Sequence, residues 1–137
     1  MEPLEALRAK IEDFPGYDGD IERRRSDEYV RSYLGEALAN AAARGQMPPE
    51  LRQRVDDLVL RVGFADPRVF AARQHIAAAT NAASERSAVA AADVAIVSLA
   101  DRADTIEPVA ASAYLDEIAG ALDRRDAAMR AAAAPMP

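Results

Sequence analysis

Apolar side chains recur along the chain at the spacing of an α-helix. The clearest recurrence starts at Tyr29 and follows an i, i+1, i+4, i+5 pattern as far as Ala41. This spacing gathers the apolar side chains on one face of a helix and leaves polar side chains on the other. Further stripes with the same period begin at Leu4, Leu51 and Leu115, and the first of them predicts a helix from Pro3 to about Phe14. The pattern therefore predicts amphipathic helices.

Proline and glycine cluster between these segments and mark where the helices end. The clusters fall at residues 15–19, 45–49, 63–67 and 107–108. Asp20 is suited to cap the second helix, Gly45 stands where that helix should end, and Pro49 suits the first position of the next. The spacing of the breaks leaves no room for a sheet. We predict an all-α fold, a single-domain bundle of five to six Ala-rich amphipathic helices over residues 1–130, with a frayed low-complexity tail over 131–137.

Between Pro67 and Ile106 neither a further proline nor a glycine occurs, so whether residues 67–106 form one helix or two is open. A helix that begins at Asp66–Pro67 could run unbroken through the whole stretch. The polar positions Thr80–Asn81 and Ser84 could instead interrupt it. We favour two helices with a short or kinked junction.

The composition limits the kind of core that the chain can build. Of the 137 residues, 33 are alanine and only 28 are leucine, isoleucine, valine or phenylalanine. Alanine helices pack closely but bury little area each, so a monomer with so few large apolar residues should be only marginally stable. We therefore expect an oligomer or a subunit of a larger complex. Cysteine is absent, which excludes disulfides and thiolate metal sites.

The formal net charge of −6 narrows the choice of partners. Proteins that bind phosphate backbones depend on clustered lysine and arginine, so nucleic acid is not an expected partner. Residues 1–14 alternate charges where a secretory signal would be apolar. The longest apolar run, Ala88–Ala100, is too short to span a bilayer. We expect a cytoplasmic protein that does not associate with membranes.

Motifs for metal or cofactor chemistry are not found in the sequence. His75 is the single histidine, and Ala72 stands three residues before it, where the Glu-x-x-His motif of di-iron bundles has a glutamate. Neither a glycine-rich phosphate loop, a nucleophile elbow nor a metal-ligand spacing occurs. We expect no metal, no cofactor and no catalytic residue, and the chain is more typical of a binding protein than of an enzyme.

Asp93 stands out because Ser98 is the only other polar residue between Ala88 and Ala100. A helix that is apolar almost all round lies at the centre of a bundle. A carboxylate buried there must be paired, hydrogen-bonded or protonated. Two interpretations follow: a structural ion pair with one of the sixteen arginines, which we favour, or a polar site for a ligand.

Two apolar faces are candidates for contact with a partner. On the first, Tyr29 and Tyr33 lie one turn apart beside Arg24 and Arg31, and tyrosine and arginine are typical interface anchors. The second face is a narrow, heptad-like seam formed by Leu115, Ile118 and Leu122. The alternative is that both stripes close the chain's own core, with the arginines paired to neighbouring carboxylates on a solvated face.

One short segment resembles a known family. Residues 62–70 read Val-Gly-Phe-Ala-Asp-Pro-Arg-Val-Phe. This resembles the turn into the second recognition helix of AraC-type helix-turn-helix regulators, in which a Val-Gly-Phe turn precedes a helix that carries a phenylalanine. Beyond this segment Ala72 and Gln74 stand where the family pattern has a basic and an aromatic residue. The resemblance implies a helix–turn–helix corner over residues 51–75.

These observations favour a non-catalytic helical interaction module, such as a small subunit, adaptor or regulator that binds a protein partner or itself. One alternative is a helix-turn-helix nucleic-acid binder that uses the 51–75 corner. The other is a small-ligand-binding bundle with a pocket near Asp93.

Overall fold

The computed structural model describes residues 2–63 and 74–133, and in the second range the side chains of residues 86–132. Across these ranges the chain is all-α and contains no strand, as the apolar pattern predicts. Its five α-helices are α1 (Pro3–Lys10), α2 (Asp20–Ala43), α3 (Arg52–Val62), α4 (Gln74–Arg102) and α5 (Ala111–Ala133). Three single turns of 3-10 helix accompany them: η1 (Pro49–Leu51), η2 (Ala103–Thr105) and η3 (Pro108–Ala110).

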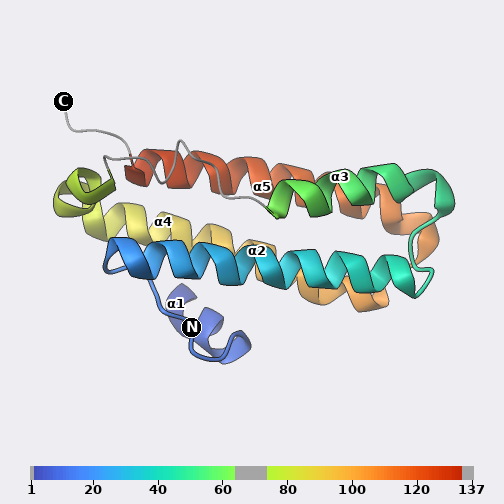
Figure 1. Ribbon diagram of the computed structural model, residues 1–137, viewed down its shortest axis with the longest axis horizontal. Helices are drawn as coiled ribbons and strands as arrows, with labels where there is room; N and C mark the ends of the chain where they lie inside the picture. The colour runs from blue at the N-terminus through green and yellow to red at the C-terminus, as the bar shows by residue number, and fades with distance from the viewer. Residues whose placement is uncertain (1, 64–73, 134–137) are drawn as a thin grey trace.

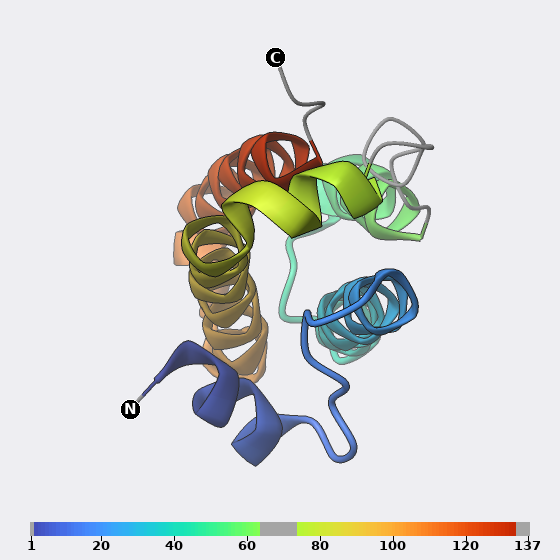
Figure 2. The same cartoon turned by 90° about the vertical axis from the view of Figure 1, so that its left-hand side faces the viewer.

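Helices α2, α3, α4 and α5 form a four-helix bundle (Figure 1). Seen along their length, they occupy the corners of a square in which α2 lies beside α3 and α4, and α5 completes the square (Figure 2). α2 and α4 run in one direction, and α3 and α5 run in the opposite one (Figure 1). α2 and α5 therefore face each other diagonally across the interior. α1 lies outside the square and packs against α4.

One of the two helix-end signals predicted for α2 is confirmed and the other is not. Gly45, with φ of +76°, ends the helix as predicted. Its N–H donates to the carbonyl of Ala42, and the N–H of Gln46 donates to the carbonyl of Ala41, which is the Schellman pattern. At the start, Gly19 takes the cap position and Asp20 is the first helical residue. Asp20 is therefore not the cap. Its carboxylate instead pairs with the guanidinium of Arg23.

α1 is shorter than the apolar stripe over residues 3–14 predicts. It ends at Lys10, and Ile11 already has extended backbone angles. Asp13 then takes a positive φ of 60°, so the chain turns back instead of continuing as a helix. Ile11 and Phe14 are still buried. The stripe correctly predicts which side chains enter the core, although its last members lie in a connection.

The two helix starts at Pro49 and Pro108 are 3-10 turns, η1 and η3, and each passes into an α-helix. Gly63 ends α3 as predicted, and its N–H donates to the carbonyl of Val59. The helix start expected at Asp66–Pro67 lies outside the described residues. α5 continues to Ala133, so the first residues of the predicted tail are helical, and 134–137 are outside the description.

The preference for two helices within residues 67–106 is wrong for the part that the structure describes. α4 is a single helix from Gln74 to Arg102, and Thr80–Asn81 and Ser84 lie inside it. Threonine, asparagine and serine keep their backbone N–H groups, and each disfavours a helix by at most about 0.7 kcal/mol relative to alanine, so these residues do not end the helix. The first turns of α4 nevertheless run across the direction of the rest (Figure 2), so the expected junction is present as a bend.

The core combines a small number of large side chains with buried alanines. Ala41, Ala103 and Ala111 are completely buried. Close approach between helices follows from such residues: a side-chain carbon added at Gly35 on α2 would lie 3.4 Å from the Val62 side chain on α3. Small residues therefore allow the helices to approach closely, so the core is close-packed although it contains few bulky side chains.

Candidate functional site

Asp93 is buried in the bundle, 1 % exposed, and it is fully engaged. Its Oδ2 accepts a hydrogen bond of 2.5 Å from the Tyr17 hydroxyl. Its Oδ1 accepts one of 2.5 Å from Nε of Arg125. The expectation that this carboxylate is buried and paired with an arginine is met, and the arginine comes from α5.

Arg125 also binds a second buried carboxylate. Its Nη2 donates to Oδ1 of Asp27 on α2 at 2.7 Å. Asp27 Oδ2 accepts from Nε of Arg31, one helical turn later, at 2.7 Å. Arg31 in turn donates from Nη1 to the carbonyl of Val62, the last residue of α3. We call Tyr17, Asp27, Arg31, Asp93 and Arg125 the buried charge network.

The buried charge network ties together every helix of the bundle. Its members come from α2, α4, α5 and the connection between α1 and α2, and it reaches the end of α3 through Arg31. The bond between Arg125 and Asp27 joins α5 to α2 across the diagonal of the square (Figure 2). A diagonal distance is too long for small apolar side chains, and the long side chain of Arg125 spans it. The network therefore lies where alanine alone would leave a void.

The connection between α1 and α2 is folded so that Tyr17 enters the bundle. Ser26 on α2 holds it, because its Oγ donates to the carbonyl of Gly16 at 2.6 Å and accepts from the Gly16 N–H at 3.0 Å. Gly16 has φ of +95°, a conformation that favours glycine. The ring of Phe14 meets that of Tyr17 edge-on, with centroids 5.8 Å apart. The position of the Tyr17 hydroxyl on Asp93 is thus fixed by the backbone before it.

Burial dominates the electrostatics of the network. It raises the pKa of Asp93 above its ordinary value, against the opposing effects of Arg125 and Tyr17. Burial lowers the pKa of Arg125, but the carboxylates of Asp93 and Asp27 outweigh that effect, so the pKa lies above the usual arginine range. Burial and the neighbouring Asp93 also raise the pKa of Tyr17. Tyr17 and Arg125 therefore remain protonated donors, and every carboxylate oxygen of the network accepts a bond from within the chain.

The candidate tyrosine face contacts other parts of the same chain. The Tyr33 hydroxyl donates to Oδ1 of Asp101 at the end of α4, at 2.5 Å. The Tyr29 ring lies 6.5 Å from that of Phe14 in the connection. Arg31 is occupied by Asp27 and the Val62 carbonyl, whereas Arg24 is exposed. The structure does not bring these four residues together as one free surface.

The seam of Leu115, Ile118 and Leu122 is buried in the chain's own core. α5 makes its most extensive contact with α4, and the seam faces inward along that contact. In this fold the seam is not available to a partner, so the alternative interpretation, that the stripe closes the core, describes it correctly.

Arg125 is the functional residue that the sequence analysis missed, although the sequence contains a signal for it. The seam runs through positions 115, 118, 122 and 129, and the 3–4 spacing requires one more inward position at 125. An arginine on an apolar stripe indicates a buried charge, in the same way as Asp93 does. Tyr17 offers no comparable signal because it lies in a proline- and glycine-rich turn, and Asp27 offers none because it follows a charged run.

Several candidate features lie outside the described part of the chain or are not found within it. The side chain of His75 and the resemblance segment beyond Gly63 are outside the description. Among the described residues, no group of three or more histidines, aspartates or glutamates is placed to hold a metal ion. None of the described helices combines the length and apolar character that crossing a bilayer requires.

No family model matches the chain, and the comparisons with curated proteins and with solved structures give no significant match. The account of its function therefore depends on the chain's own residues.

Removing Arg125 alone should destabilise the fold much more than removing Arg125 together with the charges of Asp27 and Asp93. Arg125→Met leaves two buried carboxylates without their shared counter-ion, and we expect it to lower the free energy of unfolding by about 3–5 kcal/mol. Adding Asp27→Asn and Asp93→Asn to the same chain removes those charges and should recover a large part of the loss. Urea unfolding of the three proteins measures both effects. An Arg125→Met protein as stable as the wild type would refute the structural role.

Asp93 should give the protein an unusual pH dependence. Because its folded pKa is raised, it contributes stability that is fully present below the unfolded value of about 3.9 and is lost as pH rises through the folded pKa. The free energy of unfolding of the wild type, minus that of Asp93→Asn, should therefore fall as pH increases above about 4. Urea unfolding at a series of pH values measures this difference, with the exposed Asp57→Asn as control. A difference that grows with pH would contradict the expectation.

Proposed function

We propose that the chain is a non-catalytic helical interaction module that acts by binding a protein partner through its surface. The observation that carries the proposal is the saturation of the buried charge network. A catalytic acid, base or nucleophile must exchange a proton or a bond with a substrate. Both oxygens of Asp93 and both of Asp27 already accept hydrogen bonds from Tyr17, Arg125 and Arg31. The most perturbed groups of the described chain are thus used to hold its helices.

The surface supports the proposal through its charge and its exposed apolar side chains. Among the residues whose side chains the structure describes, three large apolar ones are exposed: Ile21 in the first turn of α2 (70 %), Leu60 in the last turn of α3 (64 %) and Val109 in η3 (90 %). In this proposal a partner buries at least one of these side chains, which is favourable because the apolar surface leaves water. The net charge of −6 favours a partner with a basic surface, because opposite charges accelerate the encounter.

Helix pairs on the outside are joined by exposed ion pairs, which contribute little to stability. Arg61 of α3, for example, bridges Asp123 and Asp126 of α5, and Arg54 of α3 binds Asp116. Exposed pairs of this type are worth about 0–1 kcal/mol each. Basic groups of a partner could replace these arginines as counter-ions of the aspartates at a small cost in free energy. The ion pairs are therefore compatible with a binding surface.

The proposal predicts that charge at one exposed apolar position removes the partner without removing the fold. Complexes of the chain are isolated at native expression level by a C-terminal tag and compared for Ile21→Glu, Leu60→Glu and Val109→Glu. Each variant should keep the wild-type circular dichroism spectrum, because its side chain is exposed. At least one should reduce the bound partner about tenfold, the effect of roughly 1.4 kcal/mol at an interface.

Ala127→Glu, at an exposed position of α5, is the matched control and should retain the partner. Two results would overturn the proposal. The first is a wild-type chain that is monomeric and unaccompanied at native level. The second is equal partner occupancy in all three variants.

A further inference from the structure

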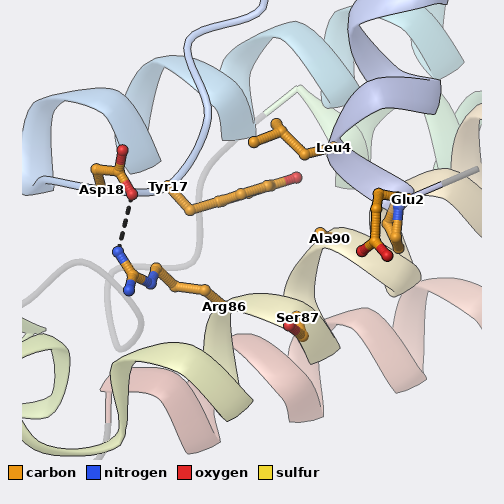
Figure 3. A pocket seen from close by; sticks show the side chains of 8 residues that line it. Glu2, Leu4, Tyr17, Asp18, Arg86, Ser87 and Ala90 are labelled. Carbon is orange, nitrogen blue, oxygen red and sulfur yellow. Dashed lines mark hydrogen bonds and ion pairs between the residues drawn. The ribbon is translucent and has the colours of Figure 1, made fainter.

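A pocket opens at the surface directly above the buried charge network. Its volume is about 290 Å³, and its lining includes Glu2 and Leu4 from the start of the chain and Ser87 and Ala90 from α4. The ring of Tyr17 lies across it, between Leu4 and Arg86 (Figure 3). The same Tyr17 places its hydroxyl on Asp93. The buried charge network therefore holds one wall of the pocket in place.

The two ends of the pocket differ in charge. At one end Arg86 forms an ion pair of 2.8 Å with Asp18 (Figure 3). At the other end lies the carboxylate of Glu2, for which the described chain supplies neither a hydrogen bond nor an ion pair. Between the ends the surface is formed by Leu4, Ala90 and the aromatic ring. Within the described chain, the pocket thus places the Glu2 carboxylate, which has no partner there, beside a surface formed by Leu4, Ala90 and the Tyr17 ring.

We infer that this pocket binds a primary alkylammonium group, with the ammonium on Glu2 and its short methylene chain against Leu4, Ala90 and the Tyr17 ring. An ammonium pairs with a carboxylate through charge-assisted hydrogen bonds. The ring face of a tyrosine also attracts a cation, and methylene groups gain by leaving water. The volume accommodates a chain of several methylenes. This chemistry is shared by a free amine and by the lysine side chain of a protein, and the inference does not depend on the proposed function.

The experiment is a titration of the isotope-labelled, C-terminally tagged chain followed by its backbone amide NMR signals. The first probe is n-butylammonium chloride, and n-butanol has the same butyl chain without the positive charge. We expect saturable shifts centred on Ser87 and Ala90 with butylammonium, and at least about fivefold weaker binding of butanol, the effect of one exposed ion pair. A second probe, N-acetyl-lysine amide, identifies the source. Tighter binding than butylammonium indicates a protein side chain, and weaker binding indicates a free amine.

Two variants at exposed positions test the site without endangering the fold. Glu2→Gln removes the charge and should weaken butylammonium binding about fivefold. Ser87→Tyr fills the pocket and should abolish the shifts. Glu50→Gln, an exposed glutamate in η1, is the matched control and should bind as the wild type does. Equal binding of butylammonium and butanol, or wild-type binding by either pocket variant, would overturn the inference.

Discussion

Arg125 lies between two buried carboxylates, Asp27 and Asp93, and the arrangement of the bundle depends on this contact. Transferring an arginine and two aspartates out of water is costly, and the cost is offset only when each charge meets a well-placed partner. Here the partners come from three helices. A shift of α2 or α5 along its axis would separate a charge from its counter-ion inside the protein. The network therefore specifies the register in which the helices pack.

This constraint extends from the centre of the bundle to its surface. Asp93 holds the Tyr17 hydroxyl, and Tyr17 belongs to the connection that Ser26 fixes through Gly16. The ring of Tyr17 then forms part of the wall of a pocket. The buried polar groups of the network thus form hydrogen bonds with one another and stabilise the packing of the helices. The outer surface and the pocket beside Tyr17, for which we propose binding, are parts of the structure that this network supports.

A large part of the fold follows from local signals in the sequence. Gly45 and Gly63 end their helices as expected, and at Gly45 the signal is local because its positive φ favours glycine. Asp93 is buried as expected, since its apolar neighbours determine its environment. The length of α1 and the continuity of α4 were predicted incorrectly. The length of α1 depends on tertiary packing, because Phe14 reaches the core from the connection that follows the helix. α4 continues because its polar residues are compatible with a helix, and its first turns run across the direction of the rest.

The candidate site was less predictable than the fold, because its members are far apart in sequence. Asp27 and Arg125 are 98 residues apart and meet only across the diagonal of the bundle.

A double-mutant cycle of Asp27→Asn and Asp93→Asn, measured by urea unfolding, tests most directly whether Arg125 couples the two carboxylates. Because both carboxylates share this guanidinium, the account predicts a coupling of about 0.5–3 kcal/mol between the two substitutions. Effects that add within about 0.3 kcal/mol would show that the two carboxylates act independently, and would contradict the account.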